Sequence, residues 1–143
     1  MARVLGVDYG EKRIGLAVSD PEGLIATPLG VQDVTGRKDA VDAVGRAAGE
    51  TGAERIVVGL PLNMDGSAGP MAEKVQVFAE RLRTRTGLPV DTWDERLSTR
   101  LVERTLIEAD VSRRKRKGLR DKLAAGVILQ GYLDAAVQDH DRV

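Results

Sequence analysis

Blocks of apolar residues with different spacings divide the chain into strands and helices. Apolar runs at Val4–Tyr9 and Arg13–Ser19 flank a short segment that contains Gly10, a pattern that predicts a β-hairpin. A third strand is predicted at residues 24–27, where Pro28 limits it, because proline donates no hydrogen bond to a strand ladder and so favours an edge strand or a strand end. The first part of the chain therefore predicts three antiparallel strands in succession.

The apolar spacing changes to that of a helix after residue 40. Val41, Val44 and Ala48 recur at helical intervals, and Gly49 and Gly52 end the pattern. The remaining predicted elements are, in chain order, a buried strand at 55–59, a helix that begins with Pro70 and ends before Gly87, a strand at 89–93, a helix at 97–108 and a last helix at about 119–137. This order predicts an α/β fold in which helices cover a mixed five-stranded sheet.

Three acidic residues occupy places where an acid lowers stability unless something pairs with it. Asp8 lies near the end of the first apolar run, Glu95 lies just beyond the fifth predicted strand, and Asp121 lies near the start of the last predicted helix. Parallel crossovers place the carboxyl ends of the fourth and fifth strands on one side of the sheet, where ligands of open α/β sheets bind. We therefore expect the three acids to meet at this edge.

Asp121 shares a helix face with small and apolar residues. At 100° per residue, five side chains point within about 60° of the direction of Asp121; these are Ala124, Ala125, Ile128, Tyr132 and Ala135. Alanines on this face let the helix approach the sheet closely and bring the carboxylate toward the strand ends. Taken alone, each acid also has a simpler explanation: Asp8 as a turn residue, Glu95 as an acid that leads into a helix, and Asp121 as a helix cap.

Carboxylate oxygens suit a hard divalent cation. We expect Mg²⁺ or Mn²⁺ at Asp8, Glu95 and Asp121, because such ions keep several waters and bind substrate phosphates. Two ions about 4 Å apart activate a water and stabilise the leaving oxygen of an in-line phosphodiester displacement. The three acids therefore predict a catalytic site that hydrolyses nucleic acid.

A basic segment precedes Asp121 in the chain. Five of its cations are consecutive: Arg113, Arg114, Lys115, Arg116 and Lys117. A run of this kind is also typical of a solvated loop and helix start, but its position next to Asp121 favours contact with phosphate. Such contacts hold a nucleic-acid backbone without reading its sequence.

Composition narrows the class of protein. A chain of 143 residues favours one domain with one core, over residues 1–143. Its 22 basic and 22 acidic residues give zero net charge, so the whole molecule is not a polycation, and the absence of cysteine excludes disulfides and thiol catalysis. No apolar run approaches the roughly 20 residues of a membrane helix, and charges near the start argue against a signal peptide. A cytoplasmic location without a membrane partner is therefore expected.

Four short motifs occur in order along the chain. They are Gly6-Val-Asp-Tyr-Gly10 with Lys12-Arg-Ile-Gly-Leu-Ala17, Gly59-Leu-Pro-Leu-Asn-Met-Asp-Gly66, Asp94-Glu-Arg-Leu-Ser-Thr99, and Asp121-Lys-Leu-Ala-Ala125 with Ile128-Leu and Tyr132-Leu. Through these motifs the chain closely resembles the YqgF/RuvX family over nearly its whole length. The resemblance implies a ribonuclease H-like, RuvC-related fold with helices on both faces of the sheet, and Asp8, Glu95 and Asp121 as a metal-binding catalytic triad.

Members of this family are regarded as nucleases that process the 5′ end of pre-16S ribosomal RNA or as resolvases of four-way DNA junctions, known as Holliday junctions. The resemblance therefore implies a metal-dependent endonuclease that acts on structured nucleic acid. A monomer suits trimming of an RNA end, whereas a two-fold dimer suits symmetric cutting of a junction. No residue decides between a monomer and a homodimer.

Three further cations near these motifs are candidates for phosphate contact. Lys12 and Arg13 lie shortly after Gly10 within the first motif, and Arg96 follows Glu95, although each is equally explained as an ordinary surface side chain. Asp94 is predicted to face away from Glu95 because side chains alternate along a strand. Residues 59–67 are expected to form a loop that either borders the site or serves only as a connector.

Two other functions are compatible with the sequence. Asp8-Tyr-Gly10 after a strand is also the start of the first phosphate loop in actin-like and sugar-kinase nucleotide hydrolases, although 143 residues hardly supply the two lobes of that fold. A non-catalytic RNA-binding ribosome assembly factor would use the basic run at 113–117 as its contact surface. Its binding would weaken steeply with salt and would survive the loss of all three acids.

Overall fold

The computed structural model describes residues 3–96 and 123–136 of the chain. Its strands are β1 (Val4–Tyr9), β2 (Arg13–Ser19), β3 (Ala26–Asp33), β4 (Arg55–Leu60) and β5 (Val90–Asp94), and its helices are α1 (Arg37–Thr51) and α2 (Pro70–Thr86), with residues 95–96 and 123–136 also helical. We call residues 123–136 the 123–136 helix. The predicted helix at 97–108 and the first residues of the predicted last helix lie outside the described residues.

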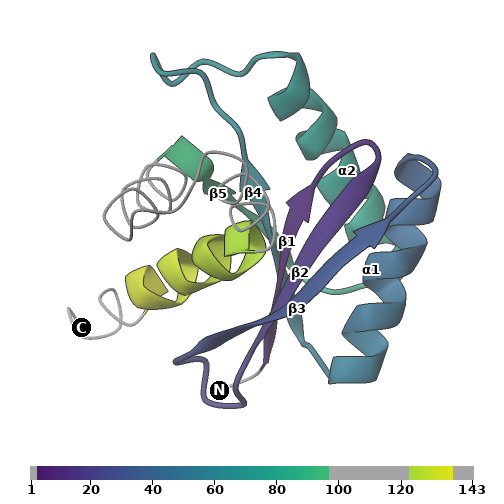
Figure 1. Cartoon of the computed structure of the whole chain (residues 1–143), viewed down its shortest axis with the longest axis vertical. Coiled ribbons are helices and arrows are strands. Elements are labelled where there is room, and N and C mark those ends of the chain that lie inside the picture. Colours follow the sequence, from purple (N-terminus) through teal and green to yellow (C-terminus); the bar gives the residue numbers. More distant parts are fainter. Residues whose placement is uncertain (1–2, 97–122, 137–143) are drawn as a thin grey trace, which may run out of the picture.

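The five strands form one mixed sheet in the order β3-β2-β1-β4-β5 (Figure 1). β1, β2 and β3 pair antiparallel in succession, and β4 is parallel both to β1 and to β5. The predicted mixed sheet, with its first three strands antiparallel, is therefore confirmed. Because β1, β4 and β5 run in the same direction, their carboxyl ends meet at one edge of the sheet.

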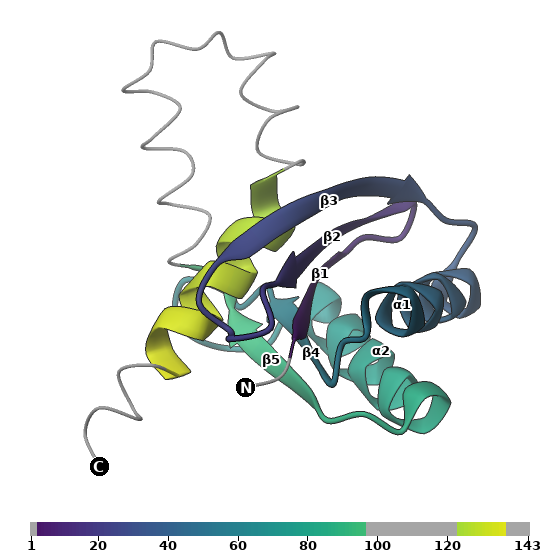
Figure 2. The ribbon, with the colours of Figure 1, turned by 90° about the horizontal axis from the view of Figure 1, so that it is seen from below.

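Side chains that alternate along the strands fill two separate cores. Leu5 and Val7 of β1 pack with α1 and α2 in the larger core, whereas Val4 lies in a smaller core with the 123–136 helix. Figure 2 shows α1 and α2 on one side of the sheet and the 123–136 helix on the other. The predicted cover of both sheet faces by helices is confirmed.

The larger core holds α2 against the sheet through its aromatic and aliphatic face. Phe78 and Leu82 are fully buried, and the Phe78 ring stacks on Tyr9 of β1 with 4.2 Å between ring centroids. Burial of one such side chain contributes about 1.5–3 kcal/mol. Among the described residues, no helix has both the length and the apolar character required to span a membrane.

The prediction for the third strand was wrong at both ends. β3 begins at Ala26 and continues through Pro28 to Asp33, instead of ending before the proline. β3 is an edge strand, one of the two positions that Pro28 was expected to favour, and an edge strand tolerates a missing backbone donor. The pairing also shifts between Leu16 and Ala17 of β2, which leaves Leu29 as an extra residue on β3.

The buried face of the 123–136 helix is rotated from the predicted one. Ala125 and Ile128 are buried as expected, but Leu129 and Leu133 complete this face, and Ala124 is only partly buried. The larger leucine side chains bury more apolar area than the alanines, so they set which face of the helix meets the sheet.

Glycine lets this helix pack closely on the sheet. A Cβ atom added at Gly6 of β1 would lie 2.7 Å from the Cβ atom of Leu129 and 3.2 Å from the carbonyl oxygen of Ala125. On the helix side, a Cβ atom added at Gly131 would lie 3.1 Å from the indole nitrogen of Trp93 in β5. Glycines on both surfaces therefore set the distance between helix and sheet.

The Gly6→Ala variant is expected to lose about 1–3 kcal/mol of stability, because the added methyl group overpacks against atoms that are held by the helix backbone. Gly49→Ala is the matched control. Gly49 is exposed in α1 and an added Cβ atom meets nothing within 4 Å, so this variant should gain about 0.5–1 kcal/mol. Urea unfolding measures both. A Gly6→Ala protein as stable as wild type would contradict the close approach.

Candidate active site

Asp8 lies on the sheet face that the 123–136 helix covers, close to the carboxyl end of β1. It pairs with Gly15 of β2 and comes one residue after the Val7–Val58 pair that joins β1 to β4. Val7 and Val58 both belong to the core on the opposite face, so alternation turns Asp8 toward the helix. Its side chain is partly buried there.

Glu95 follows the last residue of β5 and reaches Asp8 by crossing β4. The Oε1 atom of Glu95 lies only 2.6 Å from the position that a Cβ atom of Gly59 would occupy, and Ile128 of the 123–136 helix lies 2.5 Å from the same position. Because adjacent strands are about 4.8 Å apart, a side chain on β4 would separate an acid on β1 from one beside β5. Gly59 carries no side chain, and the Glu95 carboxylate uses that space.

The two carboxylates are in contact in a partly buried setting. Burial, the negative charge of Asp8 and a hydrogen bond to the Asp8 side chain together raise the pKa of Glu95 to about 8, with a smaller contribution from the charge of Asp94. The Glu95 carboxyl group therefore keeps its proton at neutral pH when no cation compensates the two charges.

This pair fits a hard divalent cation. Two carboxylates are a typical protein donor set for Mg²⁺, which takes its other oxygens from water and substrate phosphate, and a cation would remove the repulsion that raises the pKa of Glu95. Within residues 3–96 and 123–136 there is no group of three or more acidic, histidine or cysteine side chains able to hold a metal. The third predicted ligand, Asp121, lies outside the described residues, as does the basic run at 113–117.

Asp94 and Arg96 flank Glu95 and bind each other. The Arg96 Nη2 atom donates to Oδ2 of Asp94 at 2.6 Å, and its Nε atom lies 2.9 Å from the same oxygen. The hydrogen bonds from Arg96 lower the pKa of Asp94 below its usual range. Asp94 is thus an ion-pair partner of Arg96 and a separate feature from the Asp8–Glu95 pair.

The other two predicted phosphate contacts lie on the tip of the β1–β2 hairpin, which directly follows Asp8 and Tyr9. Lys12 and Arg13 both have exposed side chains. Arg13 pairs with Asp33 of β3 at 3.5 Å, and the backbone carbonyl of Lys12 accepts a hydrogen bond from Val34. Both cations lie at the sheet edge that carries Asp8, and an exposed pair such as Arg13–Asp33 is weak enough to exchange partners.

A polar cluster anchors the 123–136 helix to β4 and β5. The sequence analysis did not predict this cluster. The Tyr132 hydroxyl group donates to Oδ2 of Asp91 at 2.6 Å, and the guanidinium of Arg55 binds the same oxygen at 2.7 Å. The Tyr132 ring meets Trp93 edge to face, with 6.2 Å between centroids. Burial, followed by the interaction with Asp91, raises the pKa of Tyr132. The cluster therefore fixes the helix beside the carboxylate pair.

The role of Gly59 was also missed. Sequence reasoning placed Gly59 at the end of a strand and the start of a loop, whereas the structure places it inside β4 as the residue that makes room for Glu95. A glycine within an apolar strand is a usual sign of close approach by another group. That signal was available in the Val58-Gly59-Leu60 sequence.

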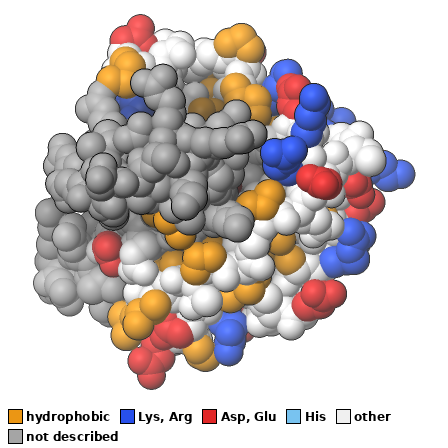
Figure 3. Space-filling model, in the orientation of Figure 1, with side chains coloured by type: hydrophobic (Ala, Val, Ile, Leu, Met, Phe, Trp, Pro, Cys, Tyr) orange, Lys and Arg blue, Asp and Glu red, His pale blue; other side chains and the backbone are white. Residues whose placement is uncertain are grey.

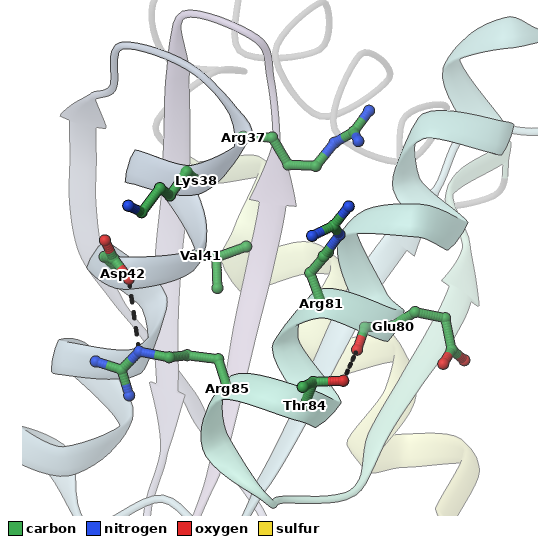
Figure 4. Close-up of a pocket in the computed structure, with 8 residues that line it drawn as sticks. All are labelled: Arg37, Lys38, Val41, Asp42, Glu80, Arg81, Thr84 and Arg85. Carbon is green, nitrogen blue, oxygen red and sulfur yellow. Dashed lines mark hydrogen bonds and ion pairs between the residues drawn. The ribbon is translucent and has the colours of Figure 1, made fainter.

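A groove of about 930 Å³ lies between α1 and α2 (Figure 4). These two helices cover the sheet face opposite to the one on which Asp8 lies. The lining of the groove is mostly charged and carries both signs, with one valine and one threonine; the residues are Arg37, Lys38, Val41, Asp42, Glu80, Arg81, Thr84 and Arg85. Arg85 pairs with Asp42 at 3.5 Å across the groove. Figure 3 likewise shows side chains of both charge signs mixed on the side of the molecule where α1 and α2 lie. The carboxylate pair, and not this groove, is therefore our candidate site.

Known proteins resemble the chain over most of its length. The family model described as RuvX, Holliday junction resolvase, matches residues 2–135. A protein of Listeria innocua serovar 6a named "Putative pre-16S rRNA nuclease" is 51% identical over 136 residues, which cover 92% of this chain and 97% of that protein. A protein of Desulforamulus reducens with the same name is 49% identical over 140 residues, covering 95% of this chain and 99% of that protein.

Two solved structures share the fold. The Holliday junction resolvase of fowlpox virus has a TM-score of 0.54 at 14% identity, and the match covers 93% of this chain and 99% of that one. RuvC of Thermus thermophilus in complex with a Holliday junction substrate has a TM-score of 0.53 at 17% identity and covers 96% of both chains. The predicted ribonuclease H-like, RuvC-related fold is therefore confirmed.

The raised pKa of Glu95 predicts a pH-dependent stability of the metal-free protein. Between its ordinary value of 4.5 and about 8, the folded state binds more protons than the unfolded state, so stability falls as pH rises through this range. Glu95→Gln should remove most of this slope and be more stable than wild type near pH 8, by on the order of 2 kcal/mol. Urea unfolding in chelator at several pH values measures the slope. A slope that is the same in both proteins would contradict the assignment.

Proposed function

Because this chain belongs to the RuvX family and is a nuclease, we propose that it hydrolyses phosphodiester bonds of structured nucleic acid with divalent cations held by Asp8, Glu95 and Asp121. The observation that carries this proposal is the contact between Asp8 and Glu95 over Gly59. Two acids forced together at the carboxyl edge of a sheet reduce stability, and such a cost is typical of a working site.

For the substrate we propose the 5′ end of pre-16S ribosomal RNA, with the Holliday junction as the second candidate. The relatives that are about half identical to this chain are named for the RNA. The name of the family model supports the DNA junction. The resolvase structures are too distant in sequence to add weight to either substrate, since their identities of 14% and 17% support the fold alone.

In this proposal Asp8 and Glu95 hold Mg²⁺ or Mn²⁺ from neighbouring parts of the same sheet edge, and Asp121 completes the ligand set. When bound, the cation lowers the pKa of a water molecule and neutralises charge on the phosphate. Glu95 must release its proton before it can bind the cation, so cation affinity rises with pH up to about 8. β1 and β5 keep the two carboxylates in place, since Asp8 lies in β1 and Glu95 directly follows β5.

Two groups of cations supply the nucleic-acid contacts in this proposal. Lys12 and Arg13 extend from the hairpin that follows Asp8. The basic residues Arg113, Arg114, Lys115, Arg116 and Lys117 precede Asp121 in the chain. Phosphate contacts of this kind position a backbone next to the carboxylates without reading bases, which leaves selection of the substrate to its shape.

Asp8→Asn and Glu95→Gln are expected to reduce cleavage by about 100-fold or more while binding persists, because each removes one ligand charge from the cation. The measurement is cleavage of a labelled pre-16S leader RNA and a labelled four-way DNA junction, with Mn²⁺, Mg²⁺ or chelator. Asp42→Asn, which removes an acid from the α1–α2 groove, is the control and should cut as wild type does.

The outcomes separate the alternatives. An Asp8→Asn protein that cuts at the wild-type rate would show that Asp8 is not a catalytic residue. If only one of the two substrates is cut in a metal-dependent reaction, that substrate distinguishes rRNA processing from junction resolution. Binding of RNA without cutting by the wild-type protein under every metal condition would favour the non-catalytic assembly factor.

Gly59→Ala is expected to reduce cleavage at least about tenfold although it leaves every acid in place, because the new methyl group occupies the space of the Glu95 carboxylate and misplaces a cation ligand. Gly49→Ala, on the exposed side of α1, should cut normally. Turnover and circular dichroism should be measured on the same preparations. A folded Gly59→Ala protein with wild-type turnover would contradict the role of this glycine.

A further inference from the structure

We propose that Arg96 is a positioning residue that fastens the loop of residues 61–69 to the end of β5 beside Glu95, and that it does not bind substrate phosphate. The sequence made Arg96 a candidate for phosphate contact because it directly follows Glu95. The contact between Arg96 and this loop does not depend on the function of the protein. Its effect on cleavage rests on the nuclease function proposed above.

All three nitrogen atoms of the Arg96 guanidinium donate to protein oxygens. The Nε and Nη2 atoms bind the Asp94 carboxylate at 2.6–3.1 Å, with both acceptor oxygens engaged. The Nη1 atom donates to the backbone carbonyl oxygen of Met64 at 3.3 Å. The backbone N–H of Arg96 also donates to Asp94, at 3.0 Å. This forked arrangement holds the guanidinium in one orientation.

The loop that Arg96 binds has its own internal order. The backbone N–H of Asn63 donates to the carbonyl of Ser67 at 2.9 Å, and that of Gly66 donates to the carbonyl of Asn63 at 2.8 Å. The hydroxyl group of Ser67 donates to Asp65 at 2.6 Å. Gly66 has a φ angle of +87°, a left-handed conformation that glycine adopts without strain. The loop is therefore a compact turn that can be held through a single point, the Met64 carbonyl.

The charges around Arg96 also disfavour phosphate. Asp94 and Asp65 both act on the Arg96 guanidinium, so two acids surround one cation. An incoming phosphate would meet a guanidinium whose charge is already compensated and would be repelled by the excess negative charge. The contacts themselves favour a structural role, because Asp94 binds the guanidinium at the end of β5 while the Met64 carbonyl binds it on the loop.

The position of this contact connects it to the carboxylate pair. The loop leaves β4 directly after Leu60, and Leu60 pairs with Asp94 at the end of the β4–β5 ladder. The residue before Leu60 is Gly59, over which Glu95 reaches Asp8. Arg96 therefore ties the loop that follows β4 to the end of β5, directly beside Glu95. Loss of this tie is expected to loosen the loop and to misplace Glu95.

Backbone amide exchange tests the fastening directly. Arg96→Gln and Asp94→Asn should each accelerate exchange of the Asn63 and Gly66 amides by about tenfold, as expected for loss of a charge-assisted hydrogen bond. The double variant should exchange no faster than either single variant, because both changes break the same contact. Arg85→Gln and Asp42→Asn disrupt another Arg–Asp pair, in the α1–α2 groove, and should leave these amides unchanged.

Nucleic-acid binding distinguishes a direct phosphate contact from the fastening. It is measured on pre-16S leader RNA in an Asp8→Asn background as a function of salt. A direct contact predicts that Arg96→Gln lowers the salt slope by about one, whereas Asp94→Asn frees the guanidinium and tightens binding. The fastening predicts an unchanged slope for Arg96→Gln in that background. With Asp8 intact, it predicts a similar fall in turnover for both single variants, with Arg96→Lys recovering part of it.

Unchanged exchange of the Asn63 and Gly66 amides in both single variants would overturn the proposal, as would a lower salt slope together with tighter binding by Asp94→Asn. Faster exchange in a protein that cuts neither substrate would support the fastening while the proposed function fails. The exchange measurement therefore separates the two proposals.

Discussion

Glu95 can reach Asp8 only because the strand between them carries a glycine at the crossing point. β1 and β5 lie on either side of β4, and any side chain at position 59 would collide with the Glu95 carboxylate or with Ile128 above it. This absence of one methyl group brings two acids into contact, raises the pKa of Glu95 to about 8 and creates a donor pair that a divalent cation can neutralise. The contact between Asp8 and Glu95 therefore depends on Gly59, a residue that has no side chain and takes no part in binding a cation.

The acid pair reduces stability, and the rest of the fold compensates for it. The larger core, with Phe78 and Leu82 of α2 against β1, lies on the sheet face away from the acids and is free to be fully apolar. On the other face, Gly6 permits close packing of the 123–136 helix, while Tyr132 is bound to Asp91. The apolar core on one face of the sheet supplies stability, and the close packing of the 123–136 helix on the other face fixes its position. Together they allow a destabilising pair of acids to persist in a small protein.

Sequence patterns predicted the order and type of the helices and strands, because the spacing of apolar residues and the positions of glycine and proline are local properties of the chain. The predictions failed where contacts between residues far apart in the sequence determine the structure. Pro28 was expected to lie in an edge strand or at a strand end; the edge position is confirmed, but the strand continues through the proline to Asp33. The 123–136 helix turned toward Leu129 and Leu133, since the fit against Gly6 and Trp93 depends on contacts that helical spacing does not encode. Asp8 and Glu95 were expected at one edge and do meet there, but the strand they cross could only be found in three dimensions.

Arg96 is a second case in which the sequence alone could not show the spatial neighbours of a residue. An arginine next to a catalytic acid is commonly interpreted as a phosphate ligand, and adjacency in sequence offers nothing against that interpretation. In space, Asp94 lies two residues earlier on the end of β5 and the Met64 carbonyl lies on the loop after β4, so the guanidinium meets acceptors of its own protein first. A cation contributes to substrate binding only to the extent that its charge is still uncompensated. By that criterion Arg96, whose guanidinium already binds Asp94, is expected to contribute little to phosphate binding although it directly follows Glu95 in sequence.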